Sequence, residues 1–375
     1  MGVFLLIVGL LLFVGLVVIH EYGHFIAARR NGVDVEEFGI GFPPRAWGKK
    51  TKAGFIFSIN WLPIGGFVKL KGEHDADTEK GTFGAASLKT KVKIMLAGVG
   101  MNLLGAFVLF TILAWVGMPH LIENQFTIKN DTKVVKQEVL VGYIAKDSPA
   151  AKAGLQQRDQ LIRISGEHGK SSAIISAAEL PALTQKYAGQ DVTIEYRRDG
   201  AIKKAPLQLL SQSQVDASKK TDNPKGFLGV SPTEYKLTRA TWSAPIVALG
   251  VIKQFTVTTF QGLGSAIAAV FQGNGSKASE QVSGPVGIVV ILKEGSLLGI
   301  EFMLMIIGII SLTLAIMNVL PIPALDGGRL FVLLISRMLG QPLTEEMEER
   351  INAIGFISLM LLVVLITIVD VKRYF

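Results

Sequence analysis

Four long stretches of the chain carry no charged residue and are long enough to cross a lipid bilayer as helices. They cover residues 2–19 (extending toward 28), 94–118, 302–325 and 351–369. A helix needs about 20 predominantly apolar residues to cross the ~30 Å hydrocarbon core. The pattern therefore predicts a polytopic α-helical membrane protein with four transmembrane helices and both termini on one side.

Between the first two stretches, hydrophobic and polar residues alternate with the period of a β-strand. Large apolar side chains share one face of this run: Phe55, Phe57, Ile59 and Trp61. Residues 63–66 (PIGG) turn the chain toward a second run at 67–70, and glycines and prolines at 39–44 punctuate another short extended element. We expect β-hairpins here, aromatic enough to lie against the membrane face.

A third pattern, short strands separated by polar turns, occupies residues 126–233. Strand-like runs at 139–145, 160–165 and 192–197 accompany a helical run near 176–187. The stretch is long enough for a domain of its own. We expect an α+β domain inserted between the second and third membrane helices.

The composition agrees with a membrane protein. Of the 375 residues, 49% are hydrophobic and 18% are charged, and the mean hydropathy is +0.43. The net charge of +8 does not indicate nucleic-acid binding, because the basic residues are scattered and no recognisable binding motif accompanies them. The lack of cysteine excludes thiolate ligands, so a metal would need imidazole and carboxylate groups.

Basic residues beside the apolar stretches predict their orientation. Arg29 and Arg30 follow the first stretch, and three lysines between 89 and 93 precede the second. Loops on the cytoplasmic side are enriched in Lys and Arg. We therefore place residues 29–92 in the cytoplasm, and the inserted domain and both termini outside.

The first apolar stretch ends in His20-Glu21-Tyr22-Gly23-His24, a pattern typical of zinc metalloproteases. Histidines four residues apart project from one helical face, about 6 Å apart along the axis, and can reach one cation. Glu21 is rotated by about 100° from His20, a better position for taking a proton from a metal-bound water. Ionisable groups in membrane helices are functional by default. We expect Zn²⁺ on the histidines and Glu21 as the general base.

The third stretch ends in residues 318–328 (NVLPIPALDGG), whose prolines and glycines break a helix. Irregular backbone at membrane depth is tolerated only where it is buried in protein or lines a cavity. Asp326 would be either the third metal ligand or a helix cap, and we expect the ligand. Asn318 would contact substrate or an oxyanion, or bond within the helix bundle. We expect His74, in a loop rich in charged residues, to be solvated rather than a ligand.

Residues 240–272, with Lys253 as their only charged residue, are the ambiguous part of the topology. As a fifth crossing, they would separate Asp326 from His20 and His24 by roughly a bilayer thickness. Frequent Thr, Gln, Gly and Ser favour a peripheral helix on the outer surface. We therefore expect four crossings and an active site toward the cytoplasmic side.

Together the two motifs resemble those of the site-2 protease family, in its bacterial subgroup of intramembrane zinc metalloproteases with an outer PDZ domain. The resemblance covers nearly the whole chain. It implies that His20, His24 and Asp326 hold Zn²⁺ and that Glu21 is the catalytic base. It also implies that membrane-associated strands hold an unwound substrate as an added strand. The implied substrate-contacting residues are Asn318, Pro321, Pro323, Gly39, Gly41, Gly65 and Gly66.

Two further runs bear on this resemblance. Residues 283–287 (SGPVG) resemble a family signature, whereas 97–102 (AGVGMN) lack the Gly-Pro usual there. In the inserted domain, residues 148–155 (SPAAKAGL), Asp159 and 161–166 (LIRISG) resemble a bacterial PDZ domain, with Arg158 in place of the usual glycine. Its carboxylate-binding loop, a candidate site for a C-terminal peptide, would be Gly226, Phe227, Leu228 and Gly229.

The resemblance implies an enzyme of the bacterial cytoplasmic membrane that cleaves single-span membrane proteins, such as anti-sigma factors or remnant signal peptides, with the PDZ domain filtering substrates by size or sensing partners. A non-proteolytic zinc-containing PDZ scaffold and a transporter are the alternatives; Glu21 favours the enzyme, because a scaffold needs no base.

The predicted segments are transmembrane helices at 1–28, 93–118, 297–326 and 351–371, cytoplasmic loops at 29–92 and 327–350, the PDZ domain at 126–233 and a peripheral outer-face helical region at 234–296.

Overall fold

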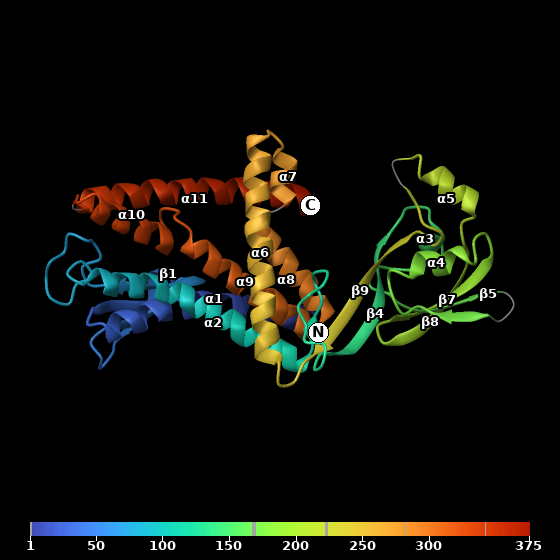
Figure 1. Ribbon diagram of the computed structural model, residues 1–375, viewed down its shortest axis with the longest axis horizontal. Coiled ribbons are helices and arrows are strands. Elements are labelled where there is room, and N and C mark those ends of the chain that lie inside the picture. Colours follow the sequence, from blue (N-terminus) through green and yellow to red (C-terminus); the bar gives the residue numbers. More distant parts are fainter. Residues whose placement is uncertain (1, 167–169, 222–223, 281, 342) are drawn as a thin grey trace. The chain divides into compact units, whose positions relative to one another are not determined.

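The computed structural model describes residues 2–166, 170–221, 224–280, 282–341 and 343–375. The chain forms two compact units (Figure 1). A helical unit comprises Met1–Val116, Gln125–Ile128 and Thr241–Phe375, and a β unit comprises Gly117–Asn124 and Lys129–Ala240. The β unit is thus inserted into the helical unit, where the polar pattern predicts a separate domain.

Five helices in the described part of the helical unit are long and apolar enough to cross a membrane. They are α1 (Gly2–Arg30), α2 (Leu88–Val116), α6 (Ala244–Phe271), α9 (Ile300–Val319) and α11 (Glu345–Tyr374). The sequence predicts four crossings, and the additional candidate is α6, the least apolar of the five. Figure 1 shows α6 running across α1 and α2 rather than alongside them. By length and composition, α6 is therefore a candidate membrane span. The direction of its axis differs from that of α1 and α2.

The helix predicted over 302–325 is shorter than expected. Helix α9 ends at Val319, and α10 (Asp326–Met338) begins at Asp326. Pro321 and Pro323 lack the amide hydrogens that a continuing helix needs. Ala324 takes a φ of 72°, in the left-handed region that non-glycine residues rarely adopt. The connection at 327–350, predicted as a loop, contains α10 and the start of α11.

Two bent strands, β1 (Val35–Lys50) and β2 (Ile56–Leu70), pair with each other, and the turn predicted at 63–66 lies within β2 instead of joining two paired strands. Residues 35–40 of β1 pair with 66–70, residues 37–40 also pair with 56–59, and residues 45–50 pair with 56–60. Gly41 and Gly65 have φ values of 78° and 92°, a conformation that costs glycine little. The half of β2 at 66–70 lies beside α1, because the Val68 amide donates to the Glu21 carboxylate.

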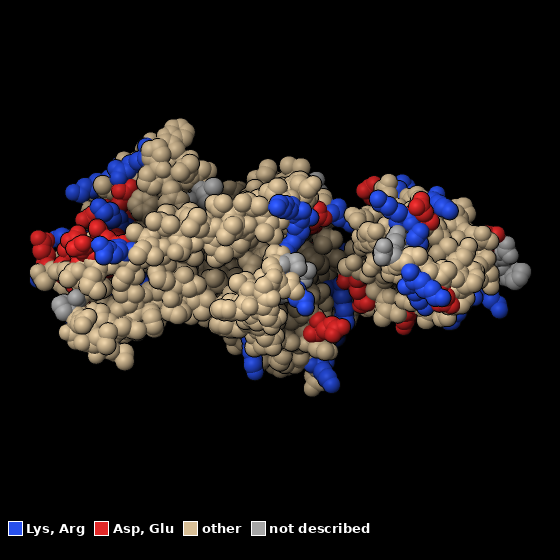
Figure 2. Space-filling view, turned by 90° about the horizontal axis from the view of Figure 1, so that it is seen from above, with Lys and Arg blue, Asp and Glu red and all other residues tan. Residues whose placement is uncertain are grey.

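The remaining helices of the helical unit are α7 (Gly275–Glu280) and α8 (Pro285–Leu298). Helices α1, α8 and α9 share a buried apolar cluster that includes Leu16, Leu292, Met303 and Ile307. Figure 2 shows broad uncharged surface on this unit, with Lys, Arg, Asp and Glu gathered mainly toward its ends. Such a surface suits contact with lipid.

A charged cluster joins the loop 71–87 to α2, α10 and α11. Lys91, only 1% exposed, donates to Asp75, and Arg337 Nη2 lies 3.2 Å from Asp75 Oδ2. Arg329 Nε donates to Glu348 Oε1 at 3.1 Å. Because Arg329 stands on the first turn of α10, these contacts hold the helix that begins at Asp326.

The β unit is built around one seven-stranded sheet with spatial order β3-β9-β4-β5-β7-β8 and β6 paired to β5. Its strands are β3 (Met118–Pro119), β4 (Lys133–Ile144), β5 (Gln160–Gly166), β6 (Ser171–Ala173), β7 (Asp191–Arg198), β8 (Ala201–Gln208) and β9 (Val230–Arg239), and its helices are α3 (Pro149–Lys152), α4 (Leu180–Gln185) and α5 (Gln212–Ser218). Strands β5 and β7 and helix α4 agree with the predicted runs to within a few residues, whereas β4 begins six residues before the run predicted at 139–145. Buried Asp159 accepts hydrogen bonds of 2.7 and 2.6 Å from Arg198, and this carboxylate raises the pKa of the guanidinium.

Candidate metal centre

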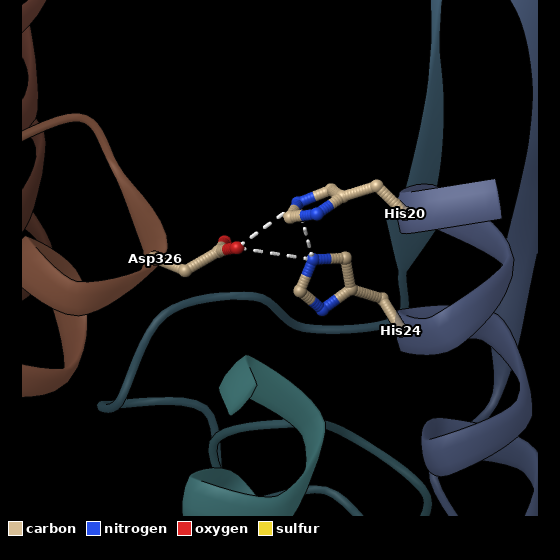
Figure 3. A group of neighbouring side chains, drawn as sticks. All are labelled: His20, His24 and Asp326. Carbon is tan, nitrogen blue, oxygen red and sulfur yellow. Dashed lines mark hydrogen bonds and ion pairs between the residues drawn. The ribbon is translucent and has the colours of Figure 1, made fainter. Parts of the chain in front are cut away.

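The side chains of His20, His24 and Asp326 converge on one point (Figure 3). Asp326 Oδ2 lies 3.1 Å from His20 Nε2 and 3.2 Å from His24 Nε2, and the two Nε2 atoms are 3.2 Å apart. The 3.6-residue helical period puts both histidines on one face of α1. The helix break after Val319 makes Asp326 the first residue of α10, so residues some 300 positions apart in the chain meet here.

The three atoms fit the coordination shell of a zinc ion. With Zn–N and Zn–O distances of about 2.0–2.1 Å, ligand atoms on a tetrahedron lie about 3.3 Å apart. The observed spacing is 3.1 to 3.2 Å. Asp326 Oδ2 is buried without a regular hydrogen-bond partner in the described structure, and both histidines are buried. Two imidazoles and a carboxylate form a three-ligand set that leaves a fourth position for water.

Helix α2 supplies the groups that contact the outer nitrogens of the two imidazoles. His24 Nδ1 lies 2.7 Å from the Ile94 carbonyl oxygen, which can only accept, so Nδ1 carries the proton and Nε2 presents its lone pair to a cation. His20 Nδ1 lies 3.2 Å from the Asn102 side-chain amide. Neither contact was predicted, because no local sequence pattern connects positions 94 and 102 with the histidines.

Glycines allow α2 to approach the site closely. A Cβ atom on Gly98 would lie 2.4 Å from His24 Nε2, and one on Gly23 would lie 2.5 Å from the Ala97 carbonyl oxygen. Both distances are far below van der Waals contact. The backbone of α2 therefore forms one wall of the site, in the run 97–102 noted for its lack of the usual Gly-Pro.

Glu21 lies between α1 and the hairpin. Its Oε2 atom accepts a hydrogen bond of 3.1 Å from the Val68 amide. A Cβ atom on Gly66 would lie 3.6 Å from Glu21 Cγ and 3.1 Å from the Gly39 carbonyl oxygen. The predicted base and the strand segment 66–70 are therefore direct neighbours, with two of the predicted substrate-contacting glycines beside them.

Three further predicted substrate-contacting residues lie around the loop between α9 and α10, whereas Gly41 and Gly65 lie in β1 and β2. Asn318 is in the last turn of α9 and half-buried, and Pro321 is exposed in the loop. Pro323 packs against α11, since a Cβ atom on Gly355 would lie 2.4 Å from Pro323 Cβ. The roles of these residues toward substrate stay predictions.

His74 lies in a second group of candidate ligands with Glu345 and Glu349. His74 Nε2 is 3.5 Å from Glu345 Oε1 and Nδ1 is 3.9 Å from Glu348 Oε2. Both Glu345 and Glu349 are exposed, and exposed acidic groups commonly occur without a metal. We therefore keep the expectation that His74 is not a metal ligand, although its side chain is only 30% exposed and not fully solvated as expected.

The loop 226–229 of the β unit lines a groove of about 640 Å³. The groove also contacts α4 and α5, through residues that include Leu180, Thr184 and Val215. Gly229 has a φ of 76°, and a Cβ atom there would lie 2.2 Å from Ser148 Cβ. The predicted carboxylate-binding loop thus borders a cavity, and its ligand stays a prediction.

Comparisons with known proteins find similarity over nearly the whole chain. The model described as Peptidase family M50 matches residues 8–362, a range that includes both motifs. A putative zinc metalloprotease of Clostridium acetobutylicum is 31% identical over 99% of this chain and 98% of its own length. The probable protease eep of Enterococcus faecalis and the zinc metalloprotease RasP of Shouchella clausii are each 26% identical, over 96% of this chain and 97% of their own.

Proposed function

The chain belongs to peptidase family M50, the site-2 protease family, and on this premise we propose that it is a zinc metalloprotease that hydrolyses peptide bonds within membrane-spanning segments of its substrates. One observation carries the proposal: three ligand atoms of His20, His24 and Asp326 lie 3.1 to 3.2 Å apart in a unit of long apolar helices. Glu21 is the residue that follows the first of them along α1.

Each residue of the site has a role in this reaction. His20, His24 and Asp326 would hold a zinc ion, which would supply the Lewis acidity that makes water acidic enough to be activated near neutral pH. Glu21 takes the proton from the attacking water and delivers it to the leaving amine. The Ile94 carbonyl oxygen keeps the His24 proton on Nδ1, which leaves Nε2 free to bind.

The hairpin beside Glu21 suits the handling of a helical substrate. A transmembrane helix must unwind before its peptide bonds are accessible, and its freed amides and carbonyls then need partners. In our proposal the segment 66–70 provides them by accepting the substrate as an added strand. In this proposal Gly39, Gly41, Gly65 and Gly66 contact the substrate from the hairpin, and Asn318, Pro321 and Pro323 contact it from the other side.

We further propose that the protein crosses the bacterial cytoplasmic membrane four times, through α1, α2, α9 and α11. Helix α6 would lie on the outer surface, a position supported by its transverse direction in Figure 1. The metal centre then faces the cytoplasmic side, and the β unit, as a single PDZ domain, lies outside. Substrates would be single-span membrane proteins, and the groove beside 226–229 would take a C-terminal peptide or merely restrict access by size.

Proteolysis and the Glu21 mechanism can be tested together. Purified protein in liposomes with a tagged transmembrane substrate should cleave it, and Glu21→Gln should lower the rate by roughly 10²–10⁴, the usual contribution of a general base. A zinc chelator should abolish cleavage, and Glu346→Gln, a change at the exposed start of α11, serves as the control. Equal cleavage by wild type, Glu21→Gln and chelated protein would contradict the proposal. Bound zinc without any cleavage would favour the scaffold.

A further inference from the structure

The outer nitrogens of the two histidines have partners of different kinds. His24 Nδ1 faces a backbone carbonyl, that of Ile94, at 2.7 Å. His20 Nδ1 faces the side chain of Asn102, whose Nδ2 lies 3.2 Å away. A substitution cannot remove the Ile94 carbonyl oxygen, because it belongs to the backbone. The Asn102 side chain can be replaced, and Asn102 is only 1% exposed.

The Asn102 contact concerns the hydrogen bond that His20 Nδ1 makes when Nε2 binds a cation. To offer Nε2 to a cation, His20 must carry its proton on Nδ1, which then donates and requires an acceptor. The Asn102 amide nitrogen is itself a donor and cannot accept. Its oxygen, Oδ1, is buried and has no partner among the described residues. Turning the amide by 180° exchanges the two atoms, so that Oδ1 accepts from His20 Nδ1 and the imidazole N–H has its acceptor.

A contact with helix α9 holds the backbone of α2 at Asn102. Ser311 on α9 donates to the Asn102 carbonyl oxygen at 2.7 Å. A Cβ atom on Gly105, one turn farther along α2, would lie 3.3 Å from Ser311 Oγ. Helices α2 and α9 therefore meet closely here, and the Asn102 side chain has little freedom to leave His20.

We propose that Asn102 is a positioning residue of the metal centre, which accepts the His20 Nδ1 hydrogen through its side-chain oxygen and so fixes the tautomer and ring orientation that bind Zn²⁺. The inference rests on the proposed function for the identity of the ion. Outer-shell partners of metal-bound histidines typically contribute 10- to 100-fold to metal affinity. Removing the Asn102 oxygen should therefore weaken zinc binding by that factor.

Zinc affinity of the full-length protein, measured in detergent by competition with a chromophoric chelator, tests the inference without relying on proteolysis. Asn102→Leu replaces both polar atoms by methyl groups on the same branched skeleton and should weaken binding about 10- to 100-fold. Asn102→Asp has only acceptor atoms facing the imidazole and should restore binding to within a few-fold of wild type. Thr111→Val is the matched control: Thr111 is also buried on α2, but its hydroxyl donates to Phe107 of the same helix.

The outcomes separate this inference from the proposed function. His20→Ala must lose the tight zinc site; wild-type affinity in that variant would overturn both. Zinc affinity lost in His20→Ala but unchanged in Asn102→Leu would overturn the Asn102 inference alone. So would Asn102→Asp binding as weakly as Asn102→Leu, since an acceptor would then not suffice. Thermal unfolding identifies folded variants, and Asn102→Ala replaces Asn102→Leu in the same comparison if the larger side chain prevents folding.

Discussion

At the scale of the single residue, Gly98 determines how closely α2 approaches the histidines. A Cβ atom there would lie 2.4 Å from His24 Nε2 and 2.6 Å from His20 Cε1. No side chain can be tolerated at such distances without moving the imidazoles or the helix. The space for the metal ligands is therefore shaped by the absence of a side chain on a neighbouring helix.

Gly98→Ala should consequently reduce zinc affinity by at least tenfold, because the added methyl group displaces the imidazoles. Gly100→Ala is the control: a Cβ atom on Gly100 would meet nothing within 4 Å. It should keep zinc binding and stabilise α2 by up to about 1 kcal/mol through helix propensity. Metal content after gel filtration and thermal unfolding report the two effects. Wild-type zinc content in Gly98→Ala would show that α2 can move away without cost.

The residues of the site differ in how far the sequence predicts them. His20 and His24 follow from a four-residue spacing within an apolar helix, and Asp326 from the helix-breaking run around it. Asn102 and Gly98 have no such signal, because their part in the site depends on how α2 packs against α1. Tertiary contacts of this kind become visible only once the helices are assembled.

At the scale of the element, the start of α8 depends on a carboxylate from another helix. The first amides of a helix have no partner within it. Asp370 on α11, which is 0% exposed, accepts hydrogen bonds from Gly284 at 2.9 Å and Gly287 at 2.7 Å. A Cβ atom on either glycine would lie 3.0 to 3.1 Å from Asp370 Oδ2. The glycines of the SGPVG run are thus explained by the close approach of this carboxylate.

Asp370→Ala should destabilise the helical unit by about 1–3 kcal/mol for each buried amide that loses its acceptor. Asp370→Asn keeps one acceptor oxygen and should lose less. Chemical unfolding in detergent, followed by circular dichroism, measures both values. If the two variants unfolded like the wild type, the amides would have to find other partners, and the proposed cap would be unimportant.

Elements with strong periodicity were predictable, and those shaped by their surroundings were not. The alternation near 55–70 correctly indicates extended chain, yet the bends that let both halves of β2 pair with residues 37–40 of β1 come from packing. The helix predicted over 302–325 ends at Val319, since the prolines act earlier than the apolar run suggests. Helix α10 was not predicted, because its contacts with the charged cluster around Arg329 stabilise it from outside.

At the scale of the whole molecule, five helices of the described chain are long and apolar enough to cross a membrane, and we propose that four of them do so. Asp326 and the histidines meet in the structure, so both must lie at the same depth. With α6 on the outer surface, the chain between α2 and α9 starts and ends outside. We therefore expect a paired periplasmic and cytoplasmic reporter fused after residue 275 to give the outer signal.

Fusions after residue 86 and after residue 220 calibrate this measurement, with cytoplasmic and outer signals expected. A cytoplasmic signal at 275, together with the expected signals at both calibration points, would make α6 a fifth crossing. Asp326 would then have to reach the histidines from the opposite side of the bilayer, which the structure does not allow with α9 as a full crossing. The ligand set would need revision in that case.

The distance in sequence between the ligands also has a consequence for biosynthesis. Helix α1 carries two imidazoles and the proposed base, but Asp326 lies more than 300 residues later. If these residues form the proposed zinc site, the early helices are made with an incomplete ligand set, and Asp326 arrives only when α10 has been made and has docked through Arg329. Under the proposed function, an unfinished chain would lack a complete metal site, and only finished molecules would hydrolyse newly inserted segments.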